Sequence, residues 1–149
     1  FGAPSGLDVN CWMLVVNDLC RQAAVDRRLV IRGPSKTVRN FITMTDVCFA
    51  LEYLISEGQI FMSPLICNLG DKTKTIFDVA SAIKQIYTDD QAISLPIIER
   101  SKGTSAISYL DFRSPVLEEL GWQPSSDFKT EISGLIKFCE SNFRSGNVN

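Results

Sequence analysis

The sequence predicts an α/β fold that is rich in helix and has few, short strands. Three observations support this prediction. Several long stretches repeat apolar residues at helical spacing, only a few short β-like runs lie between them, and the apolar fraction of 45% is high enough for a packed core. The chain has 149 residues, which suits one domain of ordinary size.

The N-terminal part of the chain predicts two helices separated by a strand and a loop. The first helix is expected over about residues 9–25, with Asp8 or Asn10 as its N-terminal cap. Leu29–Ile31 is typical of a short strand, which Gly33-Pro34 stops. After a basic loop, a second helix is expected over residues 46–56.

A buried strand and a capped helix are expected next. Residues 65–69 are apolar without strict alternation, which favours a strand buried on both faces, as in a parallel sheet. Thr75 and Asp78 have the spacing of a capping box and predict the start of a third helix. Because a complete doubly wound sheet needs more strands than this chain offers, its strands form a small sheet or pair with strands from elsewhere.

The C-terminal part predicts a short strand and two further helices. Residues 106–109 are expected to form the strand. Ser114-Pro115 and Gly121 bracket a short helix, as N-cap, first helical residue and C-terminal glycine. The last helix is expected over residues 127–143, and residues 144–149 are expected to be a frayed tail.

Charge and composition exclude several classes of function. The net charge is −2 and the pI is near 5.1, so no nucleic-acid or membrane partner is expected. Histidine is absent, which removes Ser-His-Asp catalysis and histidine-ligated metals, and no metal site is expected. The five cysteines are odd in number and lack C-x-x-C spacing, which favours buried, reduced thiols in a cytoplasmic protein.

The strongest local candidate for a binding site is a basic loop with Arg32, Lys36 and Arg39, between a strand and a helix. The planar fork of arginine suits phosphate, but three basic residues in a loop are more often a solvated surface. The same alternative applies to Arg100 and Lys102. No Gly-x-Gly-x-x-Gly motif, P-loop or nucleophile elbow occurs.

The order of several short motifs resembles one family. In chain order these motifs are Phe1-Gly-Ala-Pro4, Leu29-Val-Ile-Arg-Gly33, Arg39-Asn-Phe-Ile-Thr-Met-Thr-Asp-Val47, Cys67-Asn-Leu-Gly70, Tyr109-Leu-Asp111 and Leu120-Gly-Trp-Gln-Pro124. The sequence resembles the C-terminal half of extended short-chain dehydrogenase/reductases, the NAD-dependent epimerase/dehydratase family of nucleotide-sugar enzymes. The resemblance runs from residue 1 to about residue 140.

The resemblance implies that residues 1–149 are the C-terminal substrate-binding region of a longer, Rossmann-type enzyme. In the family, the Gly-rich loop and the catalytic Tyr-x-x-x-Lys lie in the N-terminal half, where hydride passes to NAD and back. Neither motif occurs here, because the three tyrosines are followed four positions later by Glu57, Gln91 and Arg113. We therefore expect no catalytic residues in this chain and no activity from it alone, which leaves open whether it is an enzyme.

The resemblance also implies a set of substrate-binding residues. Arg39 matches the arginine that relatives use on the nucleotide-sugar pyrophosphate, although Asn40 follows it where the family has Asp. Asp46 matches an acidic residue with a structural role. Arg100 and Tyr109 fall in the stretch that carries the second phosphate-binding arginine in relatives, but Ser101 stands in that arginine's own place.

Residues Phe1, Gly2 and Pro4 match the loop that lies beside the nicotinamide end of the cofactor in relatives. The resemblance implies NAD or NADP in the intact enzyme, with none held tightly by this chain. Residues 41–70 would pack on the missing Rossmann half, and without it we expect the chain to form a homo-oligomer.

Two alternatives to a nucleotide-sugar epimerase or dehydratase stay open. One is a non-catalytic binding or scaffold module of the same fold. The other is a reductase of the same superfamily that acts on another carbonyl.

Overall fold

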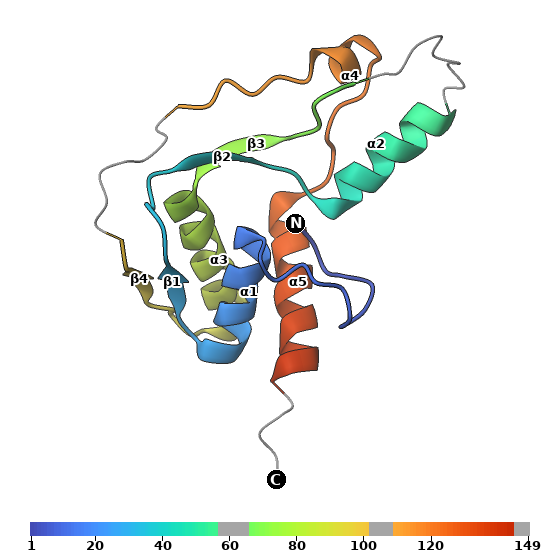
Figure 1. The fold of residues 1–149 in the computed structure, drawn as a ribbon. Helices are drawn as coiled ribbons and strands as arrows, with labels where there is room; N and C mark the ends of the chain where they lie inside the picture. Colours follow the sequence, from blue (N-terminus) through green and yellow to red (C-terminus); the bar gives the residue numbers. More distant parts are fainter. Residues whose placement is uncertain (57–65, 102–108, 145–149) are drawn as a thin grey trace.

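The computed structural model describes residues 1–56, 66–101 and 109–144 (Figure 1). In chain order the elements are α1 (Val15–Asp26), β1 (Leu29–Ile31), β2 (Val38–Phe41), α2 (Met44–Ser56), β3 (Lys72–Thr75), α3 (Ile76–Gln91), β4 (Ile97–Glu99), α4 (Pro115–Glu119) and α5 (Phe128–Phe143). The predicted α/β class, with much helix and short strands, is confirmed.

The body of the molecule is formed by α1, α3 and α5, which lie side by side, with β1 and β4 along their edge (Figure 1). The apolar stripes predicted for α1 and α5 face each other in one core. The side chains that are at most 3% exposed there include Val16, Leu19, Cys20, Ala23, Ile132, Leu135, Ile136 and Cys139. Helical spacing places these residues on one face of each helix, so their burial follows directly from the sequence.

Two small two-stranded sheets complete the described fold. β1 pairs with β4 in parallel, with Ile31 opposite Glu99. β2 pairs with β3 in antiparallel register, with Arg39 opposite Lys74 and Phe41 opposite Lys72. The β2–β3 pair passes over one end of the helical body, and its Phe41 belongs to the main core.

A second, smaller apolar cluster lies outside the body. It contains Ala50, Leu117 and Trp122, with partly buried neighbours that include Tyr53. The Tyr53 hydroxyl donates a hydrogen bond to the carbonyl of Leu120. These contacts tie α2 to α4, and α2 otherwise extends away from the helical body (Figure 1).

The structure corrects the predicted start of the first helix. α1 begins at Val15 instead of residue 9, and its N-cap is Leu14, which gives no side-chain hydrogen bond. Asp8 and Asn10 therefore do not cap it, because they lie in the exposed loop that precedes it. The capping box of Thr75 and Asp78 is confirmed.

The strand predicted over residues 65–69 is wrong for residues 66–69, and Leu65 lies outside the described residues. Residues 66–69 have no regular secondary structure, and Ile66 is 90% exposed. The apolar character of this segment predicts burial, yet no described strand pairs with it. Tyr109 is likewise not in a strand, while the rest of the predicted strand, 106–108, and most of the predicted tail, 145–149, are outside the described residues.

The cysteines are free, as expected, but they are not uniformly buried. Cys20 and Cys139 are buried, Cys11 and Cys67 are half-buried, and Cys48 is exposed on α2. The apolar neighbours of Cys48 in the sequence therefore predicted its burial wrongly. Among the described residues, no helix is both long and apolar enough to cross a bilayer.

Candidate functional site

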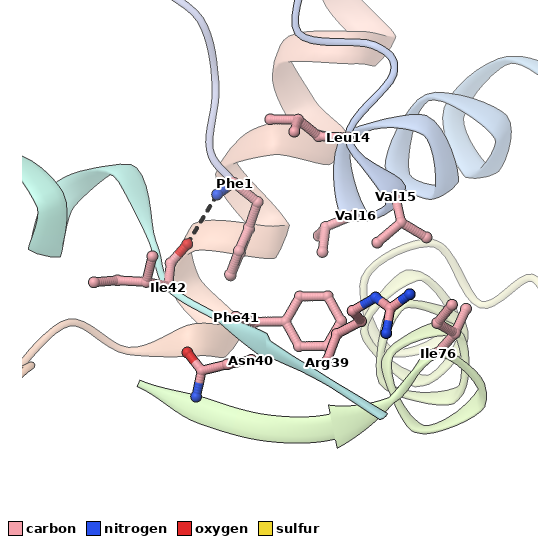
Figure 2. A pocket seen from close by; sticks show the side chains of 9 residues that line it. All are labelled: Phe1, Leu14, Val15, Val16, Arg39, Asn40, Phe41, Ile42 and Ile76. Carbon is pink, nitrogen blue, oxygen red and sulfur yellow. Dashed lines mark hydrogen bonds between the residues drawn. The ribbon is translucent and has the colours of Figure 1, made fainter. Parts of the chain in front are cut away.

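A hollow of about 330 Å³ lies between β2, the start of α1 and the first residue of the chain (Figure 2). We call it the Arg39 hollow. Its walls are mostly apolar, and the polar side chains that line it are Arg39 and Asn40. The lining residues are Phe1, Leu14, Val15, Val16, Arg39, Asn40, Phe41, Ile42 and Ile76.

Arg39 enters this hollow from β2. Its side chain passes beside the ring of Phe41 toward Ile76 (Figure 2). Its described hydrogen bond is local, from Nη1 to the carbonyl of Val38 at 3.1 Å, and no acidic side chain of the described residues pairs with it. The guanidinium therefore keeps most of its donors for an anionic ligand.

The start of α1 forms the opposite wall of the hollow. Leu14, Val15 and Val16 line the wall, and the N-cap Leu14 offers no side-chain oxygen to the first-turn N–H groups. The N-terminus of a helix carries a partial positive charge, which stabilises anions. An uncapped helix start and an arginine thus face the same space.

The first residues of the chain are held in place from three sides. The nitrogen of Phe1 donates to the carbonyl of Ile42 at 2.8 Å, and the nitrogen of Met44 donates to the carbonyl of Phe1 at 2.7 Å. The Phe1 ring packs edge-on against Phe128, with centroids 5.0 Å apart. This segment therefore forms a fixed wall of the Arg39 hollow.

Gly2 is buried at a close approach between two segments. A Cβ atom at Gly2 would come within 2.9 Å of Met44 Cβ. Its carbonyl accepts a hydrogen bond of 3.0 Å from the Nδ2 atom of Asn17, a buried residue of α1. Packing against Met44 therefore favours glycine, which has no Cβ atom, at position 2.

Asp46, in the first turn of α2, connects the segment that follows β2 to the segment before α5. It is fully buried, and its Oδ1 accepts from the backbone N–H groups of Ser125 and Ser126 at 3.0 Å each. Its Oδ2 accepts from the hydroxyls of Ser126 and Thr43. Burial alone would raise the pKa of Asp46, but these hydrogen bonds outweigh burial and hold its pKa below the ordinary value.

The role of Asn40 is also structural. Its Nδ2 donates to Thr73 Oγ1, and its Oδ1 accepts from the backbone nitrogen of Asp71, both at 3.1 Å. A Cβ atom at Gly70 would overlap Asn40 and the ring of Phe112, so glycine allows this close approach. Together these contacts hold β2 against β3 and so fix the strand that carries Arg39.

The predicted site residues do not all come together. Phe1 and Arg39 share the hollow, whereas Pro4 does not line it. Arg100 follows β4, where its backbone nitrogen donates to the carbonyl of Ile31 at 2.9 Å, and its side chain is exposed. Tyr109 is 76% exposed and lines no wall of the hollow. Lys102 lies outside the described residues.

Sequence reasoning missed the contribution of α1 to this site. Val15 and Val16 are apolar positions of the helix predicted over residues 9–25, which indicated a place in the core, and Val16 is indeed buried. A signal was available, because no Ser, Thr, Asp or Asn stands immediately before Val15, where a capped helix would carry one.

Comparison with known proteins finds a curated relative and several solved structures of the same fold. No family model matches the chain. A trifunctional UDP-glucose 4,6-dehydratase/UDP-4-keto-6-deoxy-D-glucose 3,5-epimerase/UDP-4-keto-L-rhamnose-reductase, RHM2 of Arabidopsis thaliana, is 25% identical over 115 residues. The match covers 76% of this chain and 16% of that protein.

Solved structures with bound NADPH or NAD have the same fold. RMD from Pseudomonas aeruginosa, complexed with NADPH, superposes with a TM-score of 0.72 at 19% identity, over 94% of this chain and 45% of its own. A UDP-glucuronic acid 4-epimerase from Bacillus cereus, in complex with NAD and a fluorinated UDP-sugar, gives a TM-score of 0.67 at 16% identity, over 96% and 43%. The chain thus spans less than half the length of these relatives.

Each superposition covers less than half of the relative, as the motif order predicts for one part of such an enzyme. The chain has the fold of the C-terminal portion of an extended short-chain dehydrogenase/reductase, and it is similar to part of the NAD-dependent epimerases/dehydratases that act on nucleotide sugars.

Proposed function

We propose that this chain is the substrate-binding part of an NAD(P)-dependent nucleotide-sugar epimerase or dehydratase. The observation that carries the proposal is Arg39, a cation without an acidic partner among the described residues, which projects into a hollow opposite the uncapped start of α1. Both groups favour an anion, and the diphosphate of a nucleotide sugar is an anion of the right class.

The geometry supports a preorganised binding site, in which the donors of Arg39 are held in place before a ligand binds. Asn40 holds β2 against β3, and the Asp46 hydrogen bonds fix the segment that follows β2. The start of β2 is also held, because the Ile76 nitrogen donates to the carbonyl of Thr37 at 3.1 Å, so little backbone freedom is lost when a ligand binds. Fixed donors bind and orient an anionic ligand better than mobile ones do.

The tyrosines support the proposal that the chain has no activity alone. Tyr87 is fully buried in the core, and the Tyr53 hydroxyl is engaged with the carbonyl of Leu120. Tyr109 is exposed, but no lysine follows it four positions later. Added NAD and a nucleotide sugar should therefore give no turnover, and turnover by this chain would contradict the proposal.

The first residues of the chain, which match the loop beside the cofactor in relatives, fit a cofactor only in part. Residues 1–4 are apolar and carry no side chain that could pair with the phosphates of NAD or NADP. Gly2 is buried against Met44, so Phe1 and Pro4 are the remaining candidates for a contact with a cofactor. We propose that these residues cover the end of a cofactor that other parts of the intact enzyme hold.

The exposed apolar side chains of α2 offer a contact surface for the cofactor-binding half of the enzyme. Phe49, Leu51 and Ile55 are between 48% and 80% exposed, and Ile66 is 90% exposed. Leu51 and Ile55 lie four residues apart on one face of α2, and Phe49 lies on another, so the helix exposes apolar side chains on more than one side. Exposed apolar surface of this kind is typical of an interface. We propose that residues 41–70 pack against the cofactor-binding half of the enzyme.

Calorimetric titration of this chain with UDP-, dTDP- and GDP-sugars tests the proposed function. At least one of these ligands should bind, and Arg39→Ala should weaken its binding by about 10- to 100-fold, as expected for a charged hydrogen bond. Lys36→Ala is the matched control, because it removes one positive charge from the loop just before β2, where Lys36 is exposed and does not line the Arg39 hollow. Equal effects of the two variants, or no binding at all, would contradict the proposal.

A further inference from the structure

A second hollow, of about 330 Å³, lies between β3, α3 and the start of α5. We call it the Lys74 hollow. It is separate from the Arg39 hollow, because the two have no lining residue in common. Phe1 lines the Arg39 hollow and Phe128 lines the Lys74 hollow, and these two rings pack against each other. A volume of this size is at the lower end of the range for small-molecule sites.

The floor of the Lys74 hollow is apolar and belongs to the helical body. Ile86 of α3 and Phe128 at the start of α5 are at most 8% exposed, and both are part of the main core. Ala82, one turn before Ile86 on α3, is half-buried and adds a methyl group to the lining. Because core packing holds Ile86 and Phe128 in place, the floor is preformed and offers apolar surface to the body of a ligand.

Lys74 is a half-buried cation at the rim of this floor. Its Nζ atom lies 5.9 Å from the centroid of the Phe128 ring, and this cation–π contact holds the ammonium close to the apolar surface. The other two lysines of the lining, Lys72 and Lys129, are each ion-paired with an aspartate. Lys74 forms no ion pair with the described residues, so its N–H donors are available to an anionic ligand.

The charges around the hollow set the charge of the ligand that fits it. Three lysines and two aspartates line it, so the lining carries a net charge of +1. Asp127 accepts from the nitrogen and the hydroxyl of Thr130 at 2.8 and 2.7 Å, and these hydrogen bonds hold its pKa below the ordinary value. Asp127 therefore stays a carboxylate near neutral pH. With Asp89 it would repel a ligand that carries several negative charges, whereas a single carboxylate can pair with Lys74.

We propose that the Lys74 hollow binds a small organic acid that has one carboxylate on an aromatic or branched aliphatic body. The carboxylate pairs with Lys74 at the rim, and the body lies on the floor formed by Ala82, Ile86 and Phe128. A neutral molecule of the same shape binds less well because it gives the ammonium no counter-charge, and a cation is repelled. This site does not depend on the proposed function, since neither Arg39 nor α1 lines it.

Phenylacetate, phenylacetamide and phenethylamine test the proposal, because they combine one aromatic body with an anionic, a neutral and a cationic head group. Nuclear magnetic resonance titration of the full chain, read from its backbone amides, measures the affinity and the location together. Phenylacetate should bind with a dissociation constant on the order of 1 mM, as expected for a ligand of this size. Phenylacetamide should bind at least about 5-fold more weakly, and phenethylamine more weakly still. The shifted amides should lie at 72–74, 82–89 and 127–129.

Two variants separate the role of the charge from the role of the floor. Lys74→Gln should reduce the preference for phenylacetate over phenylacetamide to about 2-fold or less. Lys137→Gln is the matched control, since it makes the same change at an exposed position of α5 outside the hollow and should keep the wild-type preference. Ala82→Leu adds bulk to the floor without a change of charge and should weaken binding of phenylacetate and phenylacetamide alike. Arg39→Ala should leave the binding of phenylacetate unchanged.

Four results would overturn the proposal. The first is that phenylacetamide binds as tightly as phenylacetate, and the second is that Lys74→Gln keeps the wild-type preference. The third is that the shifted amides lie away from the Lys74 hollow. The fourth is that phenylacetate at about 20 mM shifts no amide of the chain, since a site of the expected affinity is nearly saturated there.

Discussion

The helical body and α2 are built from similar residues but are buried very differently. In α1 and α5, each apolar stripe meets another helix of this chain, and its central side chains are at most 3% exposed. In α2, Ala50 is buried, but Phe49, Leu51 and Ile55 remain exposed, although apolar residues occur around much of the helix. A helix that is apolar on several sides is normally covered on several sides. The comparison indicates that this chain supplies a complete core for its body and an incomplete one for α2.

A matched pair of leucine substitutions is the strongest test of this difference. Leu135→Ala in α5 should lower the free energy of unfolding by about 3 kcal/mol, because Leu135 is fully buried. Leu51→Ala in α2 should change it by about 0.5 kcal/mol or less, since Leu51 is 54% exposed. Urea denaturation followed by circular dichroism measures both values. Equal losses would show that α2 is as well packed as the body.

Asp46 lies at the junction of the two regions. Its replacement should lower the free energy of unfolding somewhat less than the replacement of a core leucine does. Asp46→Asn keeps the shape but removes the charge that accepts hydrogen bonds from Ser125, Ser126 and Thr43. We expect a loss of about 2 kcal/mol at pH 7. Because the pKa of Asp46 is lower in the folded chain than in the unfolded one, its contribution is complete above about pH 4.

The pH dependence of unfolding isolates this contribution. As the pH falls through the folded-state pKa of Asp46, the wild-type chain should lose the stability that the carboxylate supplies, and the difference from Asp46→Asn should shrink. Asp78 and Asp127, whose pKa values are also lowered, by hydrogen bonds from Thr75 and Thr130 respectively, remain in both proteins and cancel in the comparison. A difference that is constant from pH 7 to low pH would show that Asp46 acts without its charge.

Sequence patterns predicted the body well because its order is local and periodic. The stripes of α1 and α5, the Thr75 capping box and the turn at Gly121, whose φ is +87°, each depend on residues that are near one another in the chain. Such features can be recognised without knowledge of the tertiary fold. The fold class followed from them.

The remaining features depend on segments that are far apart. Residues 66–69 look like a strand by composition, but a strand exists only where a partner pairs with it. The β2–β3 pair has mixed and polar residues and was not predicted, because its register is set by Asn40 and the approach at Gly70. Arg39 was predicted from the family resemblance, whereas the part played by α1 in its hollow needed the structure.

The exposed face of α2 should make the isolated chain self-associate. We expect sedimentation velocity at micromolar concentration to show dimers or larger oligomers, since a second copy can cover the apolar surface that this chain leaves open. Leu51→Lys and Ile55→Lys should shift the chain toward monomer while thermal unfolding changes little, because both side chains are largely exposed. A monomeric wild-type chain, or lysine variants that associate as the wild type does, would contradict this role for α2.

The smallest expected difference between the two regions is in the reactivity of their cysteine thiols. Cys48 on α2 is exposed and should react with a thiol reagent such as DTNB in the native chain. Burial raises the pKa of Cys139 to about 12 and also raises the pKa of Cys20, with a smaller contribution from Cys139, so neither core thiol offers a thiolate near pH 8. Mass spectrometry of the labelled peptides should find Cys48 modified first and these two only after unfolding. Because the reactive species is the thiolate in contact with solvent, early labelling of Cys20 would mean that the α1–α5 core opens, and protection of Cys48 would mean that another surface covers α2.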